Sequence, residues 1–270
     1  MILVDGVANA GLSAMDRGLA YGDGVFRTFV AQRGVARQWR RHYAKLARDC
    51  AAIGIDSPAE PLLAGEVRRV AEADEACVVK IIVTRGVGTR GYAYGAEVEA
   101  TRVVASSPLP QYPQTHGAEG VRIRRCRLRV GHQPVLAGVK HLNRLENVLA
   151  RAESNDPDIA EGLLCDAANN VIGGTMTNLF IARRGSLATP ALTRCGVAGV
   201  TRERVIEAAG RAGLACDITD LGWDQVVQAD EVILVNSVAG AWPVREIDGA
   251  ARAVGPFART IQGWLEHDDA

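Results

Sequence analysis

The segment SSPLPQYPQTHGAEG, residues 106–120, is the feature that most limits how this chain can fold. It concentrates proline, glycine and small polar residues, which end regular elements and favour turns. On both sides of it, apolar runs typical of strands alternate with apolar residues at helical spacing. We therefore predict a mixed α/β protein of two domains, with an N-terminal domain at 1–109, a linker at 110–116 and a C-terminal domain at 117–270.

The N-terminal part begins with two expected hairpins. MILVDGVAN contains the turn dipeptide Asp5-Gly6, and GVFRTFVAQRGVARQW, residues 24–39, is expected to turn at Gln32-Arg33-Gly34. Gly54 is expected to end a helix. The remaining elements expected from apolar spacing are helices at 41–53, 61–73, 201–213 and from about 255, and strands at 77–86, 101–109, 121–130, 161–166, 177–183 and 231–236.

The charge balance argues against polyanionic partners. Basic and acidic residues number 31 each, so the chain has no global electrostatic motive for binding nucleic acid or an acidic membrane. The local exception, RIRRCRLR at 122–129, fits a solvated strand face better than a phosphate-binding patch. No apolar run reaches membrane-spanning length, and no signal-peptide pattern opens the chain. We expect a cytoplasmic protein.

The six cysteines are widely spaced and form no Cys-x-x-Cys pair or Cys/His cluster. Reduced, mostly buried thiols are expected, and no metal site.

Lysine is rare in this chain, which contains three lysines among its 31 basic residues. From His141 onward, Leu142, Leu145 and Leu149 recur at helical spacing, so we expect Lys140 at or just before a helix N-terminus. The positive helix end and burial would both favour the neutral amine, which can attack an aldehyde and form a Schiff base. An exposed lysine without chemical function is the alternative.

The segment GVKHLNRLENVLAR, residues 138–151, resembles the stretch that carries the Schiff-base lysine in fold-type IV pyridoxal-phosphate enzymes, and specifically in 4-amino-4-deoxychorismate lyases. Further blocks match in the same order: DRGLAYGDGVFRT (16–28), RHYAKL (41–46), TRGVGTRGY (84–92), VIGGTMTNLF (171–180), GVAGVTRERVI (196–206) and ADEVILVNSVAGAWPV (229–244). The resemblance implies a homodimer that holds pyridoxal 5'-phosphate in a cleft between two domains. It implies conversion of 4-amino-4-deoxychorismate to 4-aminobenzoate and pyruvate in folate synthesis.

The resemblance also assigns roles to individual residues. Lys140 would hold the cofactor and then act as general base, and Thr28 would donate a proton toward the leaving enolpyruvyl group. Two loops and a cation would bind the phosphate. One loop contains Val200 and Thr201 at the start of a helix, with Thr201 as its cap. The opposing loop contains Ser237 and Val238, and the cation is Lys45.

Two of these positions depart from the family pattern. Lys45 stands where the family usually has an arginine that binds the phosphate. Lysine can neutralise the phosphate as a point charge but cannot make the two parallel hydrogen bonds of a guanidinium. Gly173 stands where a glutamate usually faces the pyridine nitrogen, so the ring is expected to be a weaker electron sink. Transamination should suffer most from this change, whereas an elimination that creates a benzene ring has its own driving force.

Two arginines are candidates for binding the two substrate carboxylates. Arg90 lies in a glycine-rich loop, and Arg144 stands where related aminotransferases typically have tyrosine. Arg144 could instead be a surface residue beside Glu146 or Asn147. Tyr92 and His141 are weaker candidates that would pack or orient.

Two other functions remain open from the sequence. One is a D-amino-acid or branched-chain aminotransferase of the same fold. The other is a non-catalytic pyridoxal-phosphate-binding protein, suggested by Gly173 and Lys45.

Overall fold

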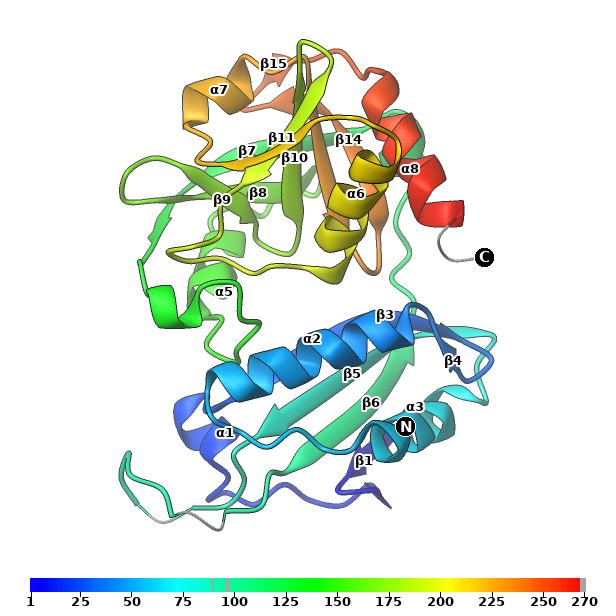
Figure 1. Cartoon of the computed structure of the whole chain (residues 1–270), viewed down its shortest axis with the longest axis vertical. Helices are drawn as coiled ribbons and strands as arrows, with labels where there is room; N and C mark the ends of the chain where they lie inside the picture. The colour runs from blue at the N-terminus through cyan, green and yellow to red at the C-terminus, as the bar shows by residue number, and fades with distance from the viewer. Residues whose placement is uncertain (89, 96–97, 268–270) are drawn as a thin grey trace. The chain divides into compact units, whose positions relative to one another are not determined.

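The computed structural model describes residues 1–88, 90–95 and 98–267. The chain divides into two compact units, each a mixture of helices and strands, as predicted (Figure 1). The first comprises Met1–Pro110 with Val139–Asn143, and the second comprises Gln111–Gly138 with Arg144–Ala270. The short segment Val139–Asn143, which the sequence analysis placed in the C-terminal domain, therefore belongs to the first unit.

The first unit contains a six-stranded antiparallel sheet in the order β2-β1-β6-β5-β3-β4. Its strands are β1 (Ile2–Val4), β2 (Val7–Ala8), β3 (Gly24–Gln32), β4 (Val35–Ala36), β5 (Ala76–Thr84) and β6 (Arg102–Pro108). Both predicted hairpins are confirmed. The turn residues Asp5 and Gly6 have φ of 49° and 80°, and Arg33 and Gly34 have φ of 47° and 78°, which matches the left-handed turns that suit two-residue hairpins.

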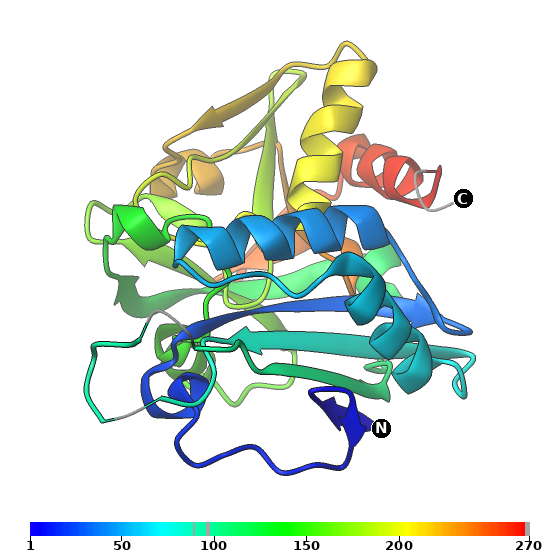
Figure 2. The ribbon, with the colours of Figure 1, turned by 60° about the horizontal axis from the view of Figure 1, so that its bottom comes forward.

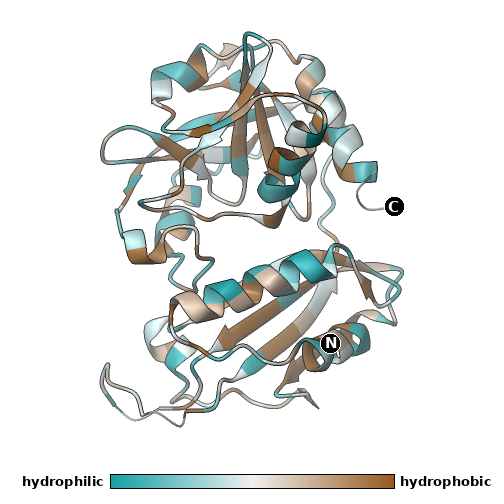
Figure 3. Ribbon diagram, in the orientation of Figure 1, coloured by the Kyte–Doolittle hydropathy of each residue, from teal (hydrophilic) through white to brown (hydrophobic). Residues whose placement is uncertain are grey.

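Three helices accompany this sheet: α1 (Arg17–Tyr21), α2 (Trp39–Ala52) and α3 (Glu60–Ala71). Gly54 follows α2 with a φ of 66°, in keeping with the predicted stop. Helices α2 and α3 cover the same face of the sheet (Figure 2). In Figure 3 the strands of this sheet are hydrophobic along most of their length, whereas α2 is mixed.

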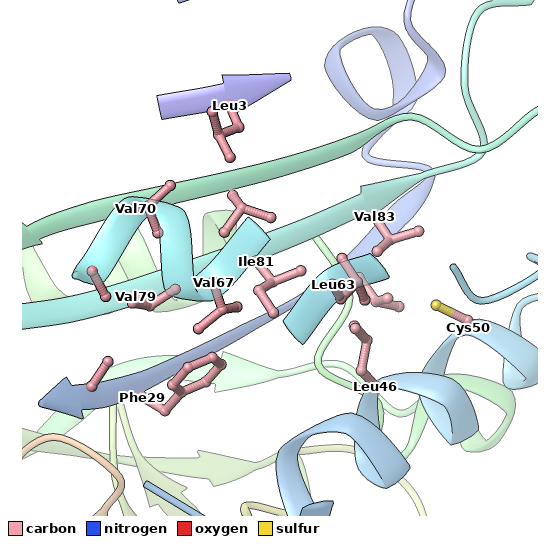
Figure 4. Close-up of a cluster of buried hydrophobic side chains, with 14 of the residues drawn as sticks. Leu3, Phe29, Leu46, Cys50, Leu63, Val67, Val70, Val79, Ile81 and Val83 are labelled. Atoms are coloured by element: carbon pink, nitrogen blue, oxygen red, sulfur yellow. The ribbon is translucent and has the colours of Figure 1, made fainter. Parts of the chain in front are cut away.

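The core of the first unit lies between the sheet and these two helices (Figure 4). Its largest fully buried side chains are Leu3, Phe29, Leu46, Leu63 and Ile81. Burying each contributes about 2 kcal/mol of apolar transfer free energy. This packing fixes β3 and α2, the elements that carry the candidate residues Thr28 and Lys45.

The second unit contains a nine-stranded mixed sheet with main order β12-β11-β10-β13-β14-β7-β8-β9, to which β15 adds beside β14. Its strands are β7 (Val121–Val130), β8 (Ile159–Asp166), β9 (Val171–Gly174), β10 (Asn178–Arg183), β11 (Ser186–Pro190), β12 (Cys216–Thr219), β13 (Glu231–Asn236), β14 (Gly240–Ile247) and β15 (Ala250–Ala251). The predicted strands at 121–130 and 231–236 match their observed bounds. Strands β9, β11, β12, β14 and β15 were not predicted.

The helical segments of this unit are α4 (Thr115–Ala118), a 3-10 turn (Pro134–Leu136), α5 (Leu145–Arg151), α6 (Val200–Arg211), α7 (Trp223–Val227) and α8 (Pro256–His267). Helices α6 and α8 pack on the sheet through Val205 and Ile261. Glu231 accepts the N–H groups of Phe257 and Ala258 at 3.0 and 3.2 Å. This buried carboxylate satisfies the start of α8, where helical N–H groups lack partners.

The basic run 122–129 lies on β7, as predicted. Arg122 pairs with Glu246 at 2.8 Å, and Arg124 pairs with Glu153 at 3.0 Å. Two of its charges are thus compensated within the unit.

All six cysteines are free thiols and five of them are buried, which confirms that prediction. No helix in the described part of the chain is long and apolar enough to cross a membrane.

Candidate active site

Lys140 lies on an extended segment that pairs with the edge of β3. Its carbonyl oxygen accepts the N–H of Phe26 at 2.9 Å, and the N–H of Leu142 donates to the carbonyl of Gly24 at 2.9 Å. His141 forms an antiparallel bridge with Val25. The segment therefore acts as a short additional strand, which holds the main chain of Lys140 against β3.

The helix predicted directly after Lys140 is wrong. Helix α5 begins at Leu145, and the residues between are extended or bent. The expected helix-dipole effect on the lysine amine therefore has no structural basis. Leu142 fits helical spacing, but its main chain pairs with Gly24, a contact distant in sequence that no local pattern reports.

The amine of Lys140 lies on one face of β3, 4.5 Å from the centre of the Phe26 ring. Thr28 follows Phe26 by two residues on the same strand, so both side chains point to that face, about 7 Å apart along the strand. Lys80 lies on the neighbouring strand β5, directly opposite Thr28, and its Nζ is 5.1 Å from the centre of the same ring. The face thus brings the predicted amine close to the predicted proton donor, and adds a cation that sequence reasoning missed.

Lys45 belongs to a buried ion cluster. Its ammonium pairs with Oδ1 of Asp49, and the guanidinium of Arg27 pairs with Oδ2 of the same carboxylate. Asp49 is 2% exposed, Arg27 3% and Lys45 9%. Sequence reasoning missed Asp49 and Arg27. The four-residue spacing of Lys45 and Asp49 was a signal for a helical ion pair, but nothing local pointed to Arg27.

Arg90 lies exposed on the loop that follows β5. The residues after it are fastened by Arg17, whose guanidinium donates to the carbonyls of Gly91 and Tyr92 at 2.9 Å each. The hydroxyl of Tyr21 accepts the Gly91 N–H at 3.1 Å. Arg90 is thus presented beside an anchored stretch rather than in a wholly unconstrained loop. Tyr92 is itself 85% exposed.

Asp23 supports the residues that hold this loop. Its carboxylate accepts Arg17 Nε at 2.9 Å and Arg85 Nε at 2.8 Å. Burial raises the pKa of Asp23, but the hydrogen bonds and charges of Arg85 and Arg17 outweigh that effect, so its pKa lies below the ordinary value. The carboxylate is therefore charged under physiological conditions.

In the second unit, the start of α6 forms a cluster of donors. The N-cap is Gly199, which corrects the prediction that Thr201 caps this helix. The hydroxyl of Thr201 instead lies 2.9 Å from that of Ser237. Val200 and Thr201 occupy the first helical positions, whose N–H groups have no partner within the helix. Two hydroxyls and a helix N-terminus therefore meet at one place, a combination suited to a phosphate.

Asn178 shapes this place and was not singled out from the sequence. Its Oδ1 accepts the Gly199 N–H at 3.1 Å and its Nδ2 donates to the Val197 carbonyl at 2.8 Å. On the facing turn, the N–H of Val238 donates to Oδ1 of Asn236 at 2.9 Å. Val238 therefore helps to shape the Ser237 turn, with its own N–H already engaged.

The backbone conformation and surroundings of Gly173 leave little room for a side chain at this position. Its φ is 153°, and a Cβ there would lie 2.9 Å from the carbonyl oxygen of Thr177. A buried acid, Glu161, lies beside the neighbouring Gly174 and is 0% exposed. Its oxygens accept the N–H groups of Gly162, Thr175 and Met176 at 2.9 to 3.0 Å and also the hydroxyls of Thr175 and Thr177. Its acceptor capacity is thus used to fix the 175–177 turn.

Arg144 is the N-cap residue of α5 and does not lie one turn along a helix from Lys140. Its Nη1 is 3.5 Å from Oδ1 of Asn147, whose Nδ2 donates to the carbonyl of Thr175 at 2.8 Å. Burial lowers the pKa of the guanidinium, against a smaller effect of Glu146. Arg144 therefore lies beside the same turn that Glu161 holds.

Each unit thus brings together part of the predicted set. The first unit gathers Lys140, Thr28 and Lys45 around β3 and α2, with Arg90 on a loop; the second gathers Val200, Thr201, Ser237 and Val238 at the start of α6, and Gly173 and Arg144 around the 175–177 turn. In the described ranges, no three His, Cys, Asp or Glu side chains are grouped so as to hold a metal ion.

The chain is similar to known proteins over nearly its whole length. The crystal structure of 4-amino-4-deoxychorismate lyase from Pseudomonas aeruginosa is 44% identical, with a TM-score of 0.94 and coverage of 99% of both chains. The aminodeoxychorismate lyase of Vibrio harveyi is 31% identical over 98% of this chain and 99% of its own length. The D-alanine aminotransferase of Bacillus licheniformis is 27% identical over 93% of this chain and 89% of its own.

The family model for amino-transferase class IV matches residues 24–247, a range that begins at β3 and ends with β14. It includes Lys140, Lys45, the start of α6 and the Ser237 turn. The chain belongs to the amino-transferase class IV family.

Proposed function

We propose that this protein is a pyridoxal-phosphate-dependent lyase that converts 4-amino-4-deoxychorismate to 4-aminobenzoate and pyruvate. Its likeness to two lyases of that name supports the substrate. The observation that carries the proposal is the position of the Lys140 amine, 4.5 Å from the Phe26 ring on the strand face that also bears Thr28.

The residues present fit pyridoxal 5'-phosphate. A primary amine for its aldehyde is supplied by Lys140, and the hydroxyls of Thr201 and Ser237, 2.9 Å apart at the start of α6, suit its phosphate. Lys45 would add a positive charge near the phosphate, although its ammonium is already in an ion pair with Asp49. When bound, the cofactor supplies an electron-withdrawing group joined to the substrate nitrogen.

Two residues of the chain would move protons. Lys140 Nζ would remove the hydrogen from the ring carbon that bears the amino group, and Thr28 Oγ1 would donate a proton to the departing enolpyruvyl group. Their shared strand face supports this division of labour. Arg90 and Arg144 would bind the substrate carboxylates.

Gly173 favours the lyase over an aminotransferase. A glutamate at this position would meet the Thr177 carbonyl, and Glu161 is occupied by the 175–177 turn. Without a carboxylate for the pyridine nitrogen, the cofactor is a weaker electron sink. An elimination that yields an aromatic ring tolerates this better than amino-group transfer does.

We propose that the enzyme is a homodimer. Leu145, Val148 and Leu149 share one face of α5 and are 67%, 60% and 52% exposed. A cluster of exposed apolar side chains on one helix is typical of a protein interface. The family resemblance implies a homodimer, and we propose that the second copy covers this face of α5. The six free thiols support a reducing compartment, the cytoplasm, where the product would enter folate synthesis.

A coupled assay tests the proposal. Purified protein loaded with pyridoxal 5'-phosphate is incubated with 4-amino-4-deoxychorismate, and pyruvate and 4-aminobenzoate are measured. Equal amounts of both are expected from the native protein and none from Lys140→Arg, which keeps the charge but lacks the primary amine. No product from the loaded native protein contradicts the lyase function. Amino transfer from D-alanine or a branched-chain amino acid without pyruvate release from the chorismate derivative would instead identify an aminotransferase.

A further inference from the structure

Asp49 joins three segments of the first unit that are far apart in the sequence. Its Oδ2 accepts the main-chain N–H of Lys140 at 3.2 Å and also pairs with the guanidinium of Arg27. Its Oδ1 pairs with the ammonium of Lys45, one helical turn earlier. Asp49 is 2% exposed, so water does not compete freely for the hydrogen bonds and ion pairs of its carboxylate.

These bonds fix the direction in which Lys140 points. Its N–H is held by Asp49, and its carbonyl is held by the N–H of Phe26 at 2.9 Å. Val139, just before it, is 5% exposed within the core of the unit. Because both peptide groups around the Lys140 Cα are fixed, the side chain leaves the main chain in one direction, toward the Phe26 ring.

The carbonyl side and the N–H side of Lys140 are held in different ways. The carbonyl side is part of the pairing with β3, which is made by main-chain groups. The N–H side depends on a side chain of α2. Loss of the Asp49 carboxylate would therefore release one end of the lysine peptide while the β3 pairing remains.

We propose that Asp49 is a positioning residue, which aims the Lys140 amine and holds Lys45 through the same carboxylate. It acts through these two lysines and does not touch substrate or cofactor. The inference rests on the proposed function, in which Lys140 binds the cofactor aldehyde and Lys45 neutralises its phosphate.

Two variants separate position from charge. Asp49→Asn keeps an oxygen that can accept the Lys140 N–H but removes the negative charge. Asp49→Ala removes both. Glu66→Ala is the matched control, because Glu66 is a 3% exposed carboxylate in the same unit that pairs with Arg102 at 2.9 Å instead.

The first readout needs no cofactor. Hydrogen exchange of the Lys140 amide is measured in the apoprotein at single-residue resolution. We expect exchange about tenfold faster or more in Asp49→Ala, and within about threefold of native in Asp49→Asn and Glu66→Ala. Equal acceleration in Asp49→Ala and Glu66→Ala, or none in Asp49→Ala, overturns the inference. If Asp49→Ala does not fold, Asp49→Asn is used alone. Exchange about tenfold faster than native in Asp49→Asn would show that the charge of Asp49 matters rather than its hydrogen bond to the Lys140 N–H, and would overturn the inference.

The second readout is the rate at which apoprotein forms a covalent link to pyridoxal 5'-phosphate, trapped with borohydride and located by mass spectrometry. A misdirected amine should react about tenfold more slowly or worse in Asp49→Ala, with Asp49→Asn within about threefold of native. Native-like rates in Asp49→Ala overturn the inference. If native protein itself forms no link at Lys140, the proposed function fails, whereas the exchange experiment still reports on the contact of Asp49 with residue 140.

Discussion

The hydroxyl oxygens of Thr201 and Ser237 lie 2.9 Å apart, although the residues are separated by 36 positions in the chain. One stands in the first turn of α6 and the other in the turn between β13 and β14. Hydroxyls that meet beside helical N–H groups suit an anion with several oxygens, and the proposed function assigns the cofactor phosphate to this place.

Removing either hydroxyl should weaken phosphate binding. We expect Thr201→Val and Ser237→Ala each to reduce the affinity of the apoprotein for pyridoxal 5'-phosphate about tenfold, because each loses a hydrogen bond to a charged group, worth about 1.5 kcal/mol. Fluorescence titration measures this. Thr260→Val, which removes a helical hydroxyl bonded to the Pro256 carbonyl, is the control and should bind as native. Unchanged affinity in both site variants would place the phosphate elsewhere.

Restoring a glutamate at position 173 should not restore an aminotransferase. Gly173→Glu must place a Cβ 2.9 Å from the Thr177 carbonyl at a φ of 153°, so we expect a loss of about 2 kcal/mol in the free energy of unfolding without a gain in amino transfer. Denaturant unfolding and a D-alanine assay check both parts. Gly185→Ala, at a φ of 79° with no atom within 4 Å, isolates the cost of the backbone alone. A stable variant with new amino transfer would refute this account of Gly173.

The first unit should lose stability in acid through Asp23. Its pKa is lowered in the folded protein, since the bonds from Arg85 and Arg17 outweigh burial. A carboxyl with a lowered folded pKa stabilises the fold fully above its unfolded pKa, near 3.8, and this contribution is lost as the pH falls below that value. The free energy of unfolding, measured from pH 6 to pH 2, should therefore decline less steeply below about pH 4 in Asp23→Asn than in the native protein. Identical slopes would show that Asp23 does not contribute.

The exposed face of α5 should control assembly. We expect the native protein to sediment as a dimer and Leu149→Arg to shift it toward monomer, because an arginine would be buried without a partner. Leu62→Arg, on α3 at a site 44% exposed, serves as the control and should remain dimeric. A monomeric native protein at micromolar concentration would contradict the homodimer.

The sequence predicted best the elements that local rules determine. Asp5-Gly6 and Gln32-Arg33-Gly34 placed two hairpins, whose turn residues Asp5, Gly6, Arg33 and Gly34 have positive φ. The apolar spacing of α2 and α6 reflects single faces buried on sheets. The segment around Lys140 failed for the opposite reason. Its leucines fit a helix, but main-chain pairing with β3, more than a hundred residues earlier, overrides local periodicity.

The candidate site shows the same division. Lys140, Thr201 and Ser237 were identified through family resemblance, which preserves short motifs. Asp49, Arg27 and Glu161 were missed because their significance lies in burial and in partners distant in sequence. The four-residue spacing of Lys45 and Asp49 fits a helical ion pair that the sequence analysis did not note, and only the fold shows that the same carboxylate reaches the Lys140 N–H.

The most direct test uses the scarcity of lysine in this chain. Protein loaded with pyridoxal 5'-phosphate is reduced with borohydride and digested, and the pyridoxyl group is located by mass spectrometry among Lys45, Lys80 and Lys140. We predict stoichiometric modification of Lys140 and none at the other two. Modification at Lys45 or Lys80 in its place, or cofactor that remains bound yet unlinked, would contradict the account.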